Sequence, residues 1–238
     1  MRRASLSLAA SIRRRQREGR FPVLSEIKVR SPKEGDLLRG RDPVALARTM
    51  DACAIAGLSV VTEALDFGGS LDIVEQVRAS VAVPILVKDF HKQPAQVEAA
   101  AAAGADVVLL TVSMMTDEQI LACQETAHRI GIETLVEIHT EADLERVVKL
   151  GVQADILGIN NRDILIGETD DGDVSRTERL VALVPGRAPL LSESAIQGPE
   201  DARRARDAGA DAVLVGTSIL RATDTAQAIK DLVAVGWQ

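Results

Sequence analysis

Short apolar runs of the β type alternate with longer amphipathic runs after residue 20, and this alternation constrains the fold more than any other feature of the chain. The eight apolar runs cover residues 22–28, 58–64, 84–90, 105–112, 133–139, 155–161, 189–194 and 211–218. Strands that alternate with helices are typical of repeated βα units, whose strands form a parallel sheet. The 238 residues suit one such domain, because an α/β barrel runs to about 250 residues.

Eight parallel strands can form either a closed (β/α)8 TIM barrel or an open doubly wound sheet. An open sheet gathers its site at one switch point, often behind a glycine fingerprint, whereas a barrel draws functional residues from all its strand ends. No GxGxxG follows residues 22–28, and polar residues end strands along the whole chain. The sequence therefore predicts the α/β class and a single (β/α)8 TIM barrel over residues 1–238, with a short N-terminal helical extension over residues 1–20.

Helix signals separate the apolar runs. The predicted starts are Asp42 before Pro43, capping boxes at Thr116 with Gln119 and at Ser175 with Glu178, and Pro199. Three helices end in the phrases AGAD (103–106), GVQAD (151–155) and AGAD (208–211), where glycine permits the left-handed turn into the next strand. The first 20 residues are rich in arginine and serine. They could be an organelle transit peptide, but we favour an amphipathic helix at residues 5–17 that covers the barrel.

The charge and the cysteines restrict the class of partner. A formal net charge of −7 argues against nucleic acid, so an anionic small molecule would need local cations at particular strand ends. No apolar run approaches the length of about 20 residues that crosses a bilayer. Cys53 and Cys123, both on predicted helices, form no disulfide or zinc pattern, which fits a reducing cytoplasm.

Charged side chains at the ends of apolar strands predict a polar mouth. Lys88 follows an apolar run and precedes Asp89, so it is either a general acid in a partly desolvated cavity or a lysine neutralised by Asp89. Glu26 and Glu137 can face the same mouth as proton acceptors, or they can pair with lysines. Asn160 and Arg162 offer an amide and a cationic fork, although an arginine is more often a surface residue.

Two loops and the last two strand ends complete the candidate features. Residues 192–196 and 215–219 place hydroxyls and small residues where barrels frequently bind phosphate. The charged loop over residues 29–43 suits a lid, or is an ordinary surface loop. Residues 164–175 form an acidic loop without EF-hand spacing, and neither His91, His128 nor His139 has a histidine partner at metal-ligand spacing. We therefore predict no metal and no cofactor.

Taken in order, these motifs resemble the indole-3-glycerol-phosphate synthase family over residues 22–221. They read SEIKVRSP, TEALDFGGS, PILVKDF, LVEIH, GINNRD, SESAI and VGTSILR. The resemblance implies a carboxy-lyase that closes 1-(2-carboxyphenylamino)-1-deoxyribulose 5-phosphate into indole-3-glycerol phosphate in tryptophan biosynthesis, with loss of carbon dioxide and water.

The resemblance also implies a role for each matched residue. Lys88 would be the general acid, Glu137 would stabilise the cationic intermediate, and Lys28 would lie near the substrate carboxylate and share proton transfer. The other implied positions are Glu26 and Asn160 at the sugar hydroxyls, Ser31, Ser194, Ala195, Gly216 and Thr217 at the phosphate, Phe67, Pro32, Leu110 and Arg162 around the anthranilate ring, and Glu193 at the substrate.

The chain departs from the family at one motif. The family usually has the sequence ESG there, whereas this chain has Glu193, Ser194 and Ala195. Alanine would donate its N–H at negative φ, so weaker phosphate binding is expected. The alternatives are a divergent enzyme of a secondary pathway, a barrel like phosphoribosylanthranilate isomerase, or a non-catalytic binding barrel. The isomerase uses a strand-end cysteine, which this chain lacks, and idle buried charges are costly. A monomer or weak homo-oligomer is expected.

Overall fold

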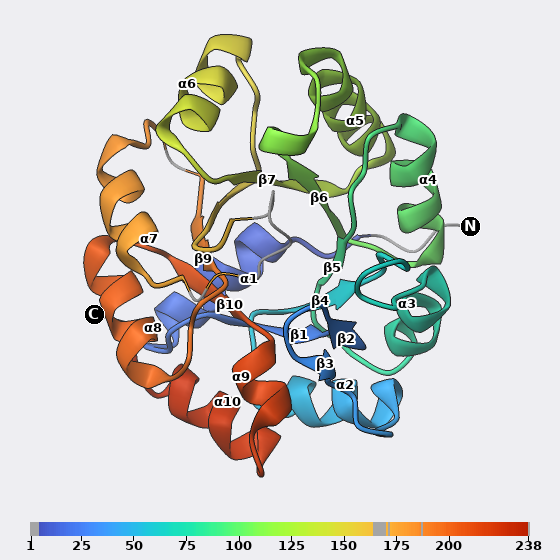
Figure 1. The fold of residues 1–238 in the computed structure, drawn as a ribbon, viewed down its shortest axis with the longest axis vertical. Helices are drawn as coiled ribbons and strands as arrows, with labels where there is room; N and C mark the ends of the chain where they lie inside the picture. Colours follow the sequence, from blue (N-terminus) through green and yellow to red (C-terminus); the bar gives the residue numbers. More distant parts are fainter. Residues whose placement is uncertain (1–4, 164–169, 171, 187, 238) are drawn as a thin grey trace.

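The computed structural model describes residues 5–163, 170, 172–186 and 188–237. Within these residues the strands close into one parallel barrel, in which each strand pairs with its neighbours along the chain and β10 pairs with β1 (Figure 1). The strands are β1 (Val23–Ile27), β4 (Gly57–Val61), β5 (Ile85–Lys88), β6 (Val107–Thr111), β7 (Glu133–Ile138), β8 (Ile156–Asn160), β9 (Leu190–Glu193) and β10 (Ala212–Val215). The predicted (β/α)8 barrel is confirmed.

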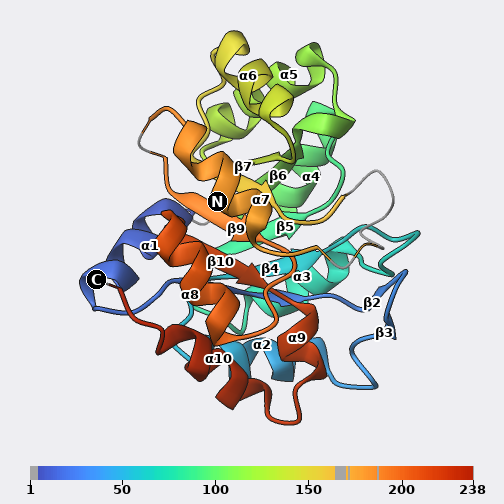
Figure 2. The ribbon, with the colours of Figure 1, turned by 60° about the vertical axis from the view of Figure 1, so that its left-hand side comes forward.

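Helices surround the barrel on the outside (Figures 1 and 2). They are α2 (Pro43–Asp51), α3 (Leu71–Arg78), α4 (Pro94–Ala103), α5 (Asp117–Ile130), α6 (Glu141–Leu150), α7 (Ser175–Leu180), α8 (Pro199–Ala208) and α10 (Thr225–Val233). Shorter elements are η1 (Val112–Met114), η3 (Val181–Leu183), α9 (Thr217–Arg221) and the hairpin of β2 (Arg30–Ser31) and β3 (Gly35–Asp36). No helix among the described residues is long and apolar enough to span a membrane.

Alternate residues of each strand serve two separate cores, as the twofold period of a strand requires. Leu24, Leu86, Leu109 and Leu135 point into the barrel, where they form one buried cluster. Their sequence neighbours face the surrounding helices and form a second, larger cluster. This parity decides which residues of a strand can reach a site in the barrel mouth.

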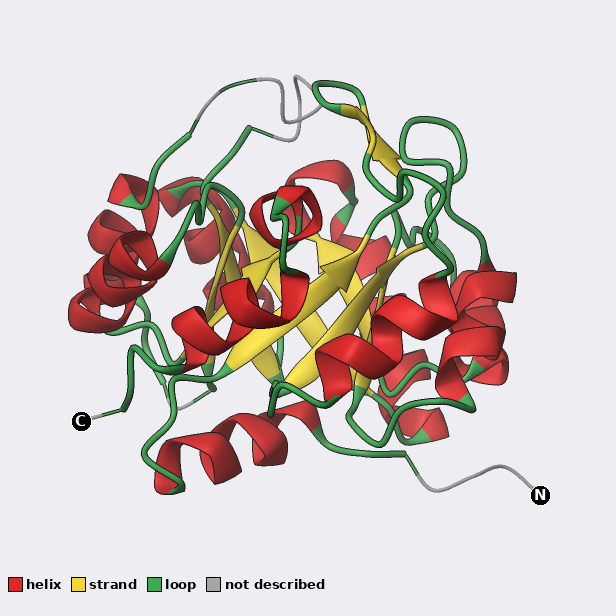
Figure 3. Ribbon diagram, turned by 90° about the horizontal axis from the view of Figure 1, so that it is seen from below, coloured by secondary structure: helices red, strands yellow, loops and turns green. Residues whose placement is uncertain are grey.

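The N-terminal extension forms helix α1 (Leu8–Arg17), which lies across the end of the barrel opposite the long loops (Figure 3). The expected helix over residues 5–17 therefore begins three residues later, because Ser7 is its cap. Leu8 and Ile12 are fully buried and plug the barrel beneath the inward leucines. The Glu133 carboxylate accepts hydrogen bonds from the N–H groups of Leu8 and Ala9, which joins the helix N-terminus to β7.

The repeated helix endings have a second purpose beyond the turn. Gly104, Gly151 and Gly209 adopt the predicted positive φ angles of 113°, 67° and 115°. The aspartate that follows each glycine accepts the N–H of a residue at the beginning of the preceding strand. The N···O distances are 2.9 Å from Ile85 to Asp106, 2.8 Å from Thr134 to Asp155 and 3.0 Å from Leu190 to Asp211. Each aspartate thus ties two neighbouring strands at the closed end of the barrel.

Three local predictions need correction. Ser175 is not a helix cap: it lies inside α7 and its hydroxyl bonds to Asp173. Cys53 lies in the turn after α2, which ends at Asp51. The run 58–64 is too long because β4 ends at Val61, and the Glu63 carboxylate then accepts the N–H groups of residues 65–67 and turns the chain.

Candidate active site

A cavity of about 730 Å³, counted with its open mouth, lies at the carboxyl ends of the strands. Its lining contains ten of the predicted site residues, namely Glu26, Lys28, Phe67, Lys88, Glu137, Arg162, Ser194, Ala195, Gly216 and Thr217. These residues come from seven strands or the loops that follow them, so the barrel brings together positions up to 191 residues apart in sequence (217 − 26).

Lys88, the last residue of β5, points toward two buried carboxylates. Its Nζ lies 3.1 Å from Glu193 Oε2 and 3.8 Å from Glu137 Oε2. The Asp89 carboxylate accepts a hydrogen bond from Thr62 Oγ1 at 2.7 Å. The carboxyl groups that Lys88 contacts thus come from β7 and β9, far from its sequence neighbour along the chain.

Glu137 is 1 % exposed and receives neutral donors on both oxygens. Thr111 Oγ1 lies 3.1 Å from Oε1, and Asn160 Nδ2 lies 3.0 Å from Oε2. Asn160 is itself held, because its Oδ1 accepts the backbone N–H of Arg162 at 3.0 Å. Asn160 therefore acts on the cavity through Glu137 and is not part of the cavity wall.

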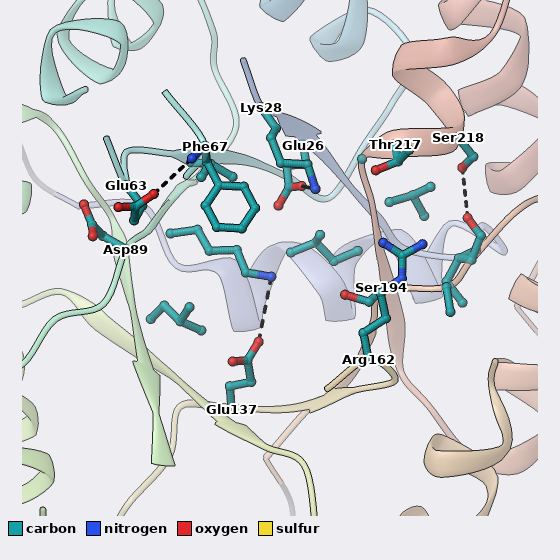
Figure 4. Close-up of a pocket in the computed structure, with 18 of the residues that line it drawn as sticks. Glu26, Lys28, Glu63, Phe67, Asp89, Glu137, Arg162, Ser194, Thr217 and Ser218 are labelled. Atoms are coloured by element: carbon teal, nitrogen blue, oxygen red, sulfur yellow. Dashed lines mark hydrogen bonds and ion pairs between the residues drawn. The ribbon is translucent and has the colours of Figure 1, made fainter. Parts of the chain in front are cut away.

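A second pair of opposite charges comes from the first strand. Lys28 Nζ lies 3.2 Å from Glu26 Oε1 and 5.8 Å from the centre of the Phe67 ring. Both charged residues are buried, at 6 % and 3 % exposure. Figure 4 shows Lys28 and Glu26 together on the side of the cavity opposite Glu137.

Glu193 is the most deeply buried acid of the site, with no exposed surface. Burial raises the pKa of this carboxyl from 4.5 to about 8, Lys88 opposes the shift, and Glu137 adds to it. Its Oε1 has no hydrogen-bond partner within the described part of the chain. Gly158 makes room for it, since a Cβ there would lie 2.1 Å from Oε1. When Glu193 is protonated, the two positive charges of Lys28 and Lys88 equal in number the two negative charges of Glu26 and Glu137.

The raised pKa of Glu193 predicts a particular pH dependence of stability. A carboxyl whose folded pKa lies above its unfolded pKa stabilises the fold fully below about pH 4.5 and loses that contribution as pH rises through about 8. The unfolding free energy of the wild type relative to Glu193→Gln should therefore fall by several kcal/mol between pH 5 and pH 9. Urea unfolding at both pH values measures it, with the exposed Glu145→Gln as control. A difference that stays constant with pH would rule out the buried protonated acid.

The wall opposite Glu63 and Asp89 offers a guanidinium and two hydroxyl groups. Arg162, Ser194 and Thr217 gather there, away from Glu63 and Asp89 (Figure 4). Ser194 and Ala195 have φ of 64° and 57°, so Ala195 does not have the negative φ that was the condition for donation of its N–H. A left-handed alanine costs roughly 1 kcal/mol, which the surrounding fold must offset. The usual glycine of the family would adopt this conformation without that strain.

Five predicted site residues lie outside the cavity wall. Ser31 and the exposed Pro32 belong to the hairpin above the mouth, and Asn160 and Glu193 lie behind the wall. Leu110 faces the helices, and it is Leu109, one residue earlier, that lines the cavity. The strand parity set by Glu137 and its partner Thr111 would have identified Leu109.

Other lining residues were not predicted individually. Phe90 and Ile196 line the cavity from within the motifs PILVKDF and SESAI, whereas Gln197 and Val61 belong to ordinary loop or apolar stretches. The predicted lid, residues 29–43, contacts the loop after β8. Lys33 Nζ lies 3.3 Å from the carbonyl oxygen of Asp170. Most of the acidic loop, residues 164–169 and 171, lies outside the described residues.

No group of three or more metal-ligating side chains occurs among the residues that the structure describes. His128 is on α5 beside Asp155, at 3.0 Å. His91 is buried in the loop after β5, where burial lowers its pKa and its Nδ1 lies 3.0 Å from the Leu109 carbonyl. His139 follows β7 directly, with its Nε2 3.9 Å from Glu137 Oε1.

Known proteins resemble the chain over nearly its whole length. The family model described as indole-3-glycerol phosphate synthase matches residues 1–232. A protein of that name from Pyrococcus furiosus is 41% identical over 212 residues, which cover 89% of this chain and 91% of the relative. One from Thermococcus kodakarensis is 38% identical and covers 96% and 97%. One from a Nocardioides species is 41% identical and covers 90% and 80%.

Proposed function

The chain belongs to the indole-3-glycerol phosphate synthase family, and we propose that the strand-end side chains described above divide the work of that family's reaction. Its function is that of an indole-3-glycerol phosphate synthase, which is a carbon–carbon lyase of tryptophan biosynthesis. It closes 1-(2-carboxyphenylamino)-1-deoxyribulose 5-phosphate to indole-3-glycerol phosphate and releases carbon dioxide and water. No observation favours an isomerase or a non-catalytic barrel.

Lys88 is the general acid in this proposal, and its position carries the argument. Ring closure turns the ribulose carbonyl into a hydroxyl, so an acid must protonate that oxygen, and the hydroxyl must later leave as water. An ammonium group at the cavity wall, 3.1 Å from Glu193 and 3.8 Å from Glu137, is held where it can donate such a proton.

Glu137 and Lys28 act on either side of that acid. Attack by the aromatic carbon leaves positive charge on the ring and its nitrogen, and the Glu137 carboxylate stabilises this charge across the cavity. Lys28 binds the carboxylate that is lost as carbon dioxide, beside the aromatic ring of Phe67. Glu26 holds Lys28 at 3.2 Å and faces the sugar hydroxyls, while Asn160, behind the cavity wall, holds Glu137 at 3.0 Å.

The phosphate binds against the wall that Arg162, Ser194 and Thr217 share. Ser194, Ala195, Gly216 and Thr217 supply hydroxyl and backbone donors, and Ser31 reaches them from the hairpin when the loop closes. Arg162, Phe67 and Leu109 line the cavity around the aromatic end, and Pro32 reaches it from the hairpin when the loop closes. A protonated Glu193 adds no negative charge to a site that receives an anionic substrate.

The surroundings of the protein follow from the same features. We place it in a reducing cytoplasm, since Cys53 and Cys123 are free and buried. It acts on a small phosphorylated substrate as a monomer or weak homo-oligomer, and its net charge of −7 disfavours nucleic acid. No cofactor is needed, because the reaction uses only proton transfer and charge stabilisation.

The activity is tested by mixing the purified protein with 1-(2-carboxyphenylamino)-1-deoxyribulose 5-phosphate and following the appearance of indole fluorescence. We expect turnover with that substrate and none with phosphoribosylanthranilate, the substrate of the isomerase. Fluorescence that does not rise with the first compound would overturn the assignment of this reaction to the chain.

A further inference from the structure

The carboxylate of Glu137 meets a hydroxyl from the neighbouring strand. Thr111 is the last residue of β6 and pairs in register with Glu137 of β7. Its Oγ1 lies 3.1 Å from Glu137 Oε1, and the two residues are 2 % and 1 % exposed. An ionised carboxylate can only accept, so the threonine hydroxyl donates.

The groups around Glu137 fall into two sides. Oε2 faces Asn160 Nδ2 from β8 at 3.0 Å and Lys88 Nζ from β5 at 3.8 Å, and Glu193 of β9 lies beyond Lys88. Oε1 faces Thr111 and, at 3.9 Å, His139 Nε2. His139 Nε2 is buried and has no hydrogen-bond partner among the described residues. A carboxylate released by Thr111 would therefore find a new hydrogen-bond donor, His139 with its proton on Nε2, on the side away from Lys88.

We propose that Thr111 is a positioning residue, whose hydroxyl holds Glu137 with Oε2 turned toward Lys88 and prevents the carboxylate from turning toward His139. The inference rests on the proposed role of Glu137. The other inward residues of β6, Val107 and Leu109, are apolar and belong to the buried core. If position 111 had only to fill space in the barrel, valine would fill it as well as threonine. The hydroxyl is explained by its contact with Glu137.

The test compares Thr111→Val, which keeps the volume and removes the donor, with Thr111→Ser, which keeps the donor. A hydrogen bond to a charged group has the strength to change a rate by roughly 10- to 100-fold. We expect Thr111→Val to lower kcat by that factor, with KM within about twofold of the wild type, and Thr111→Ser to recover most of the rate.

The rescue by serine separates positioning from a general structural defect. We expect kcat to fall in Thr111→Val while KM and the circular dichroism spectrum stay close to those of the wild type, and kcat to return in Thr111→Ser. An equal loss of kcat in both variants, or a rate of Thr111→Val equal to that of the wild type, would overturn the proposal. The wild type and Lys88→Met are assayed beside them: if the wild type forms no indole, the reaction itself is misassigned.

Discussion

Replacing Lys88 by methionine is expected to lower kcat by about 10³-fold while the protein remains folded. Methionine preserves the length and flexibility of the side chain and removes the acidic proton, and general acid catalysis contributes roughly 10²- to 10⁴-fold. The buried partner Glu193 has its pKa raised to about 8, so it can remain neutral when the ammonium group is absent. Steady-state indole fluorescence gives kcat, and circular dichroism confirms the fold.

The matched control is Lys92→Met, a lysine four residues further along the chain that is exposed and does not line the cavity. We expect this variant to keep the rate of the wild type within about twofold, because an exposed lysine outside the cavity contributes little. Equal rates for Lys88→Met and the wild type would remove Lys88 as the acid and leave Lys28 as the remaining candidate in the cavity.

Substitution of Asp106 by alanine is expected to lower the free energy of unfolding by roughly 3–5 kcal/mol. The carboxylate is fully buried and accepts from Ile85 N at 2.9 Å, Leu6 N at 2.7 Å and Arg78 Nη1 at 2.7 Å. Its removal leaves a largely buried guanidinium without this counter-charge and two backbone donors without this acceptor. The loss is measured from urea unfolding curves.

Asp207→Ala serves as the control for this prediction. Asp207 also pairs with an arginine, Arg206, at 2.8 Å, but its side chain is 59 % exposed. Surface ion pairs contribute up to about 1 kcal/mol, so this variant should unfold close to the wild type. Two variants of equal stability would show that Asp106 does not join the strands and the N-terminal extension in solution.

The part of the fold that depends on local patterns could be predicted from the sequence. Apolar runs, proline at helix starts and glycine at helix ends all express conformational preferences of neighbouring residues, and each predicted strand and the three glycines are present. The predicted end of β4 lies too far along the chain. The strand ends earlier because the Glu63 side chain accepts hydrogen bonds from the backbone of the following loop. That hydrogen bonding has no counterpart in apolar periodicity.

The aspartates of the repeated AGAD phrases show a similar limit. The glycine could be interpreted from its own backbone requirement, whereas Asp106 acts on Ile85, which lies 21 residues earlier and on another strand. The same separation recurs for Asp155 with Thr134 and Asp211 with Leu190. A repeated distance between an acid and a strand start was present in the sequence, but only the closed sheet shows why it matters.

The partners within the site depended on the closure of the barrel. Sequence adjacency suggests Asp89 as the counter-ion of Lys88, but Asp89 follows the end of β5 and its carboxylate accepts a hydrogen bond from Thr62 Oγ1. The contact with Glu193 spans 105 residues and forms because both strands end at one mouth. The prediction of Leu110 in place of Leu109 has a related cause. Matching a motif does not consider which residues of a strand point into the barrel, and Leu109 points inward whereas Leu110 faces the helices.

The most direct measurement is a crystal structure of Lys88→Met with unreacted 1-(2-carboxyphenylamino)-1-deoxyribulose 5-phosphate in the cavity. The account predicts the phosphate against Ser194, Ala195, Gly216 and Thr217, the carboxylate near Lys28, and the ribulose carbonyl oxygen facing the side chain at position 88. A substrate bound in the reverse direction, or with its carbonyl on the far side of the cavity from position 88, would contradict it.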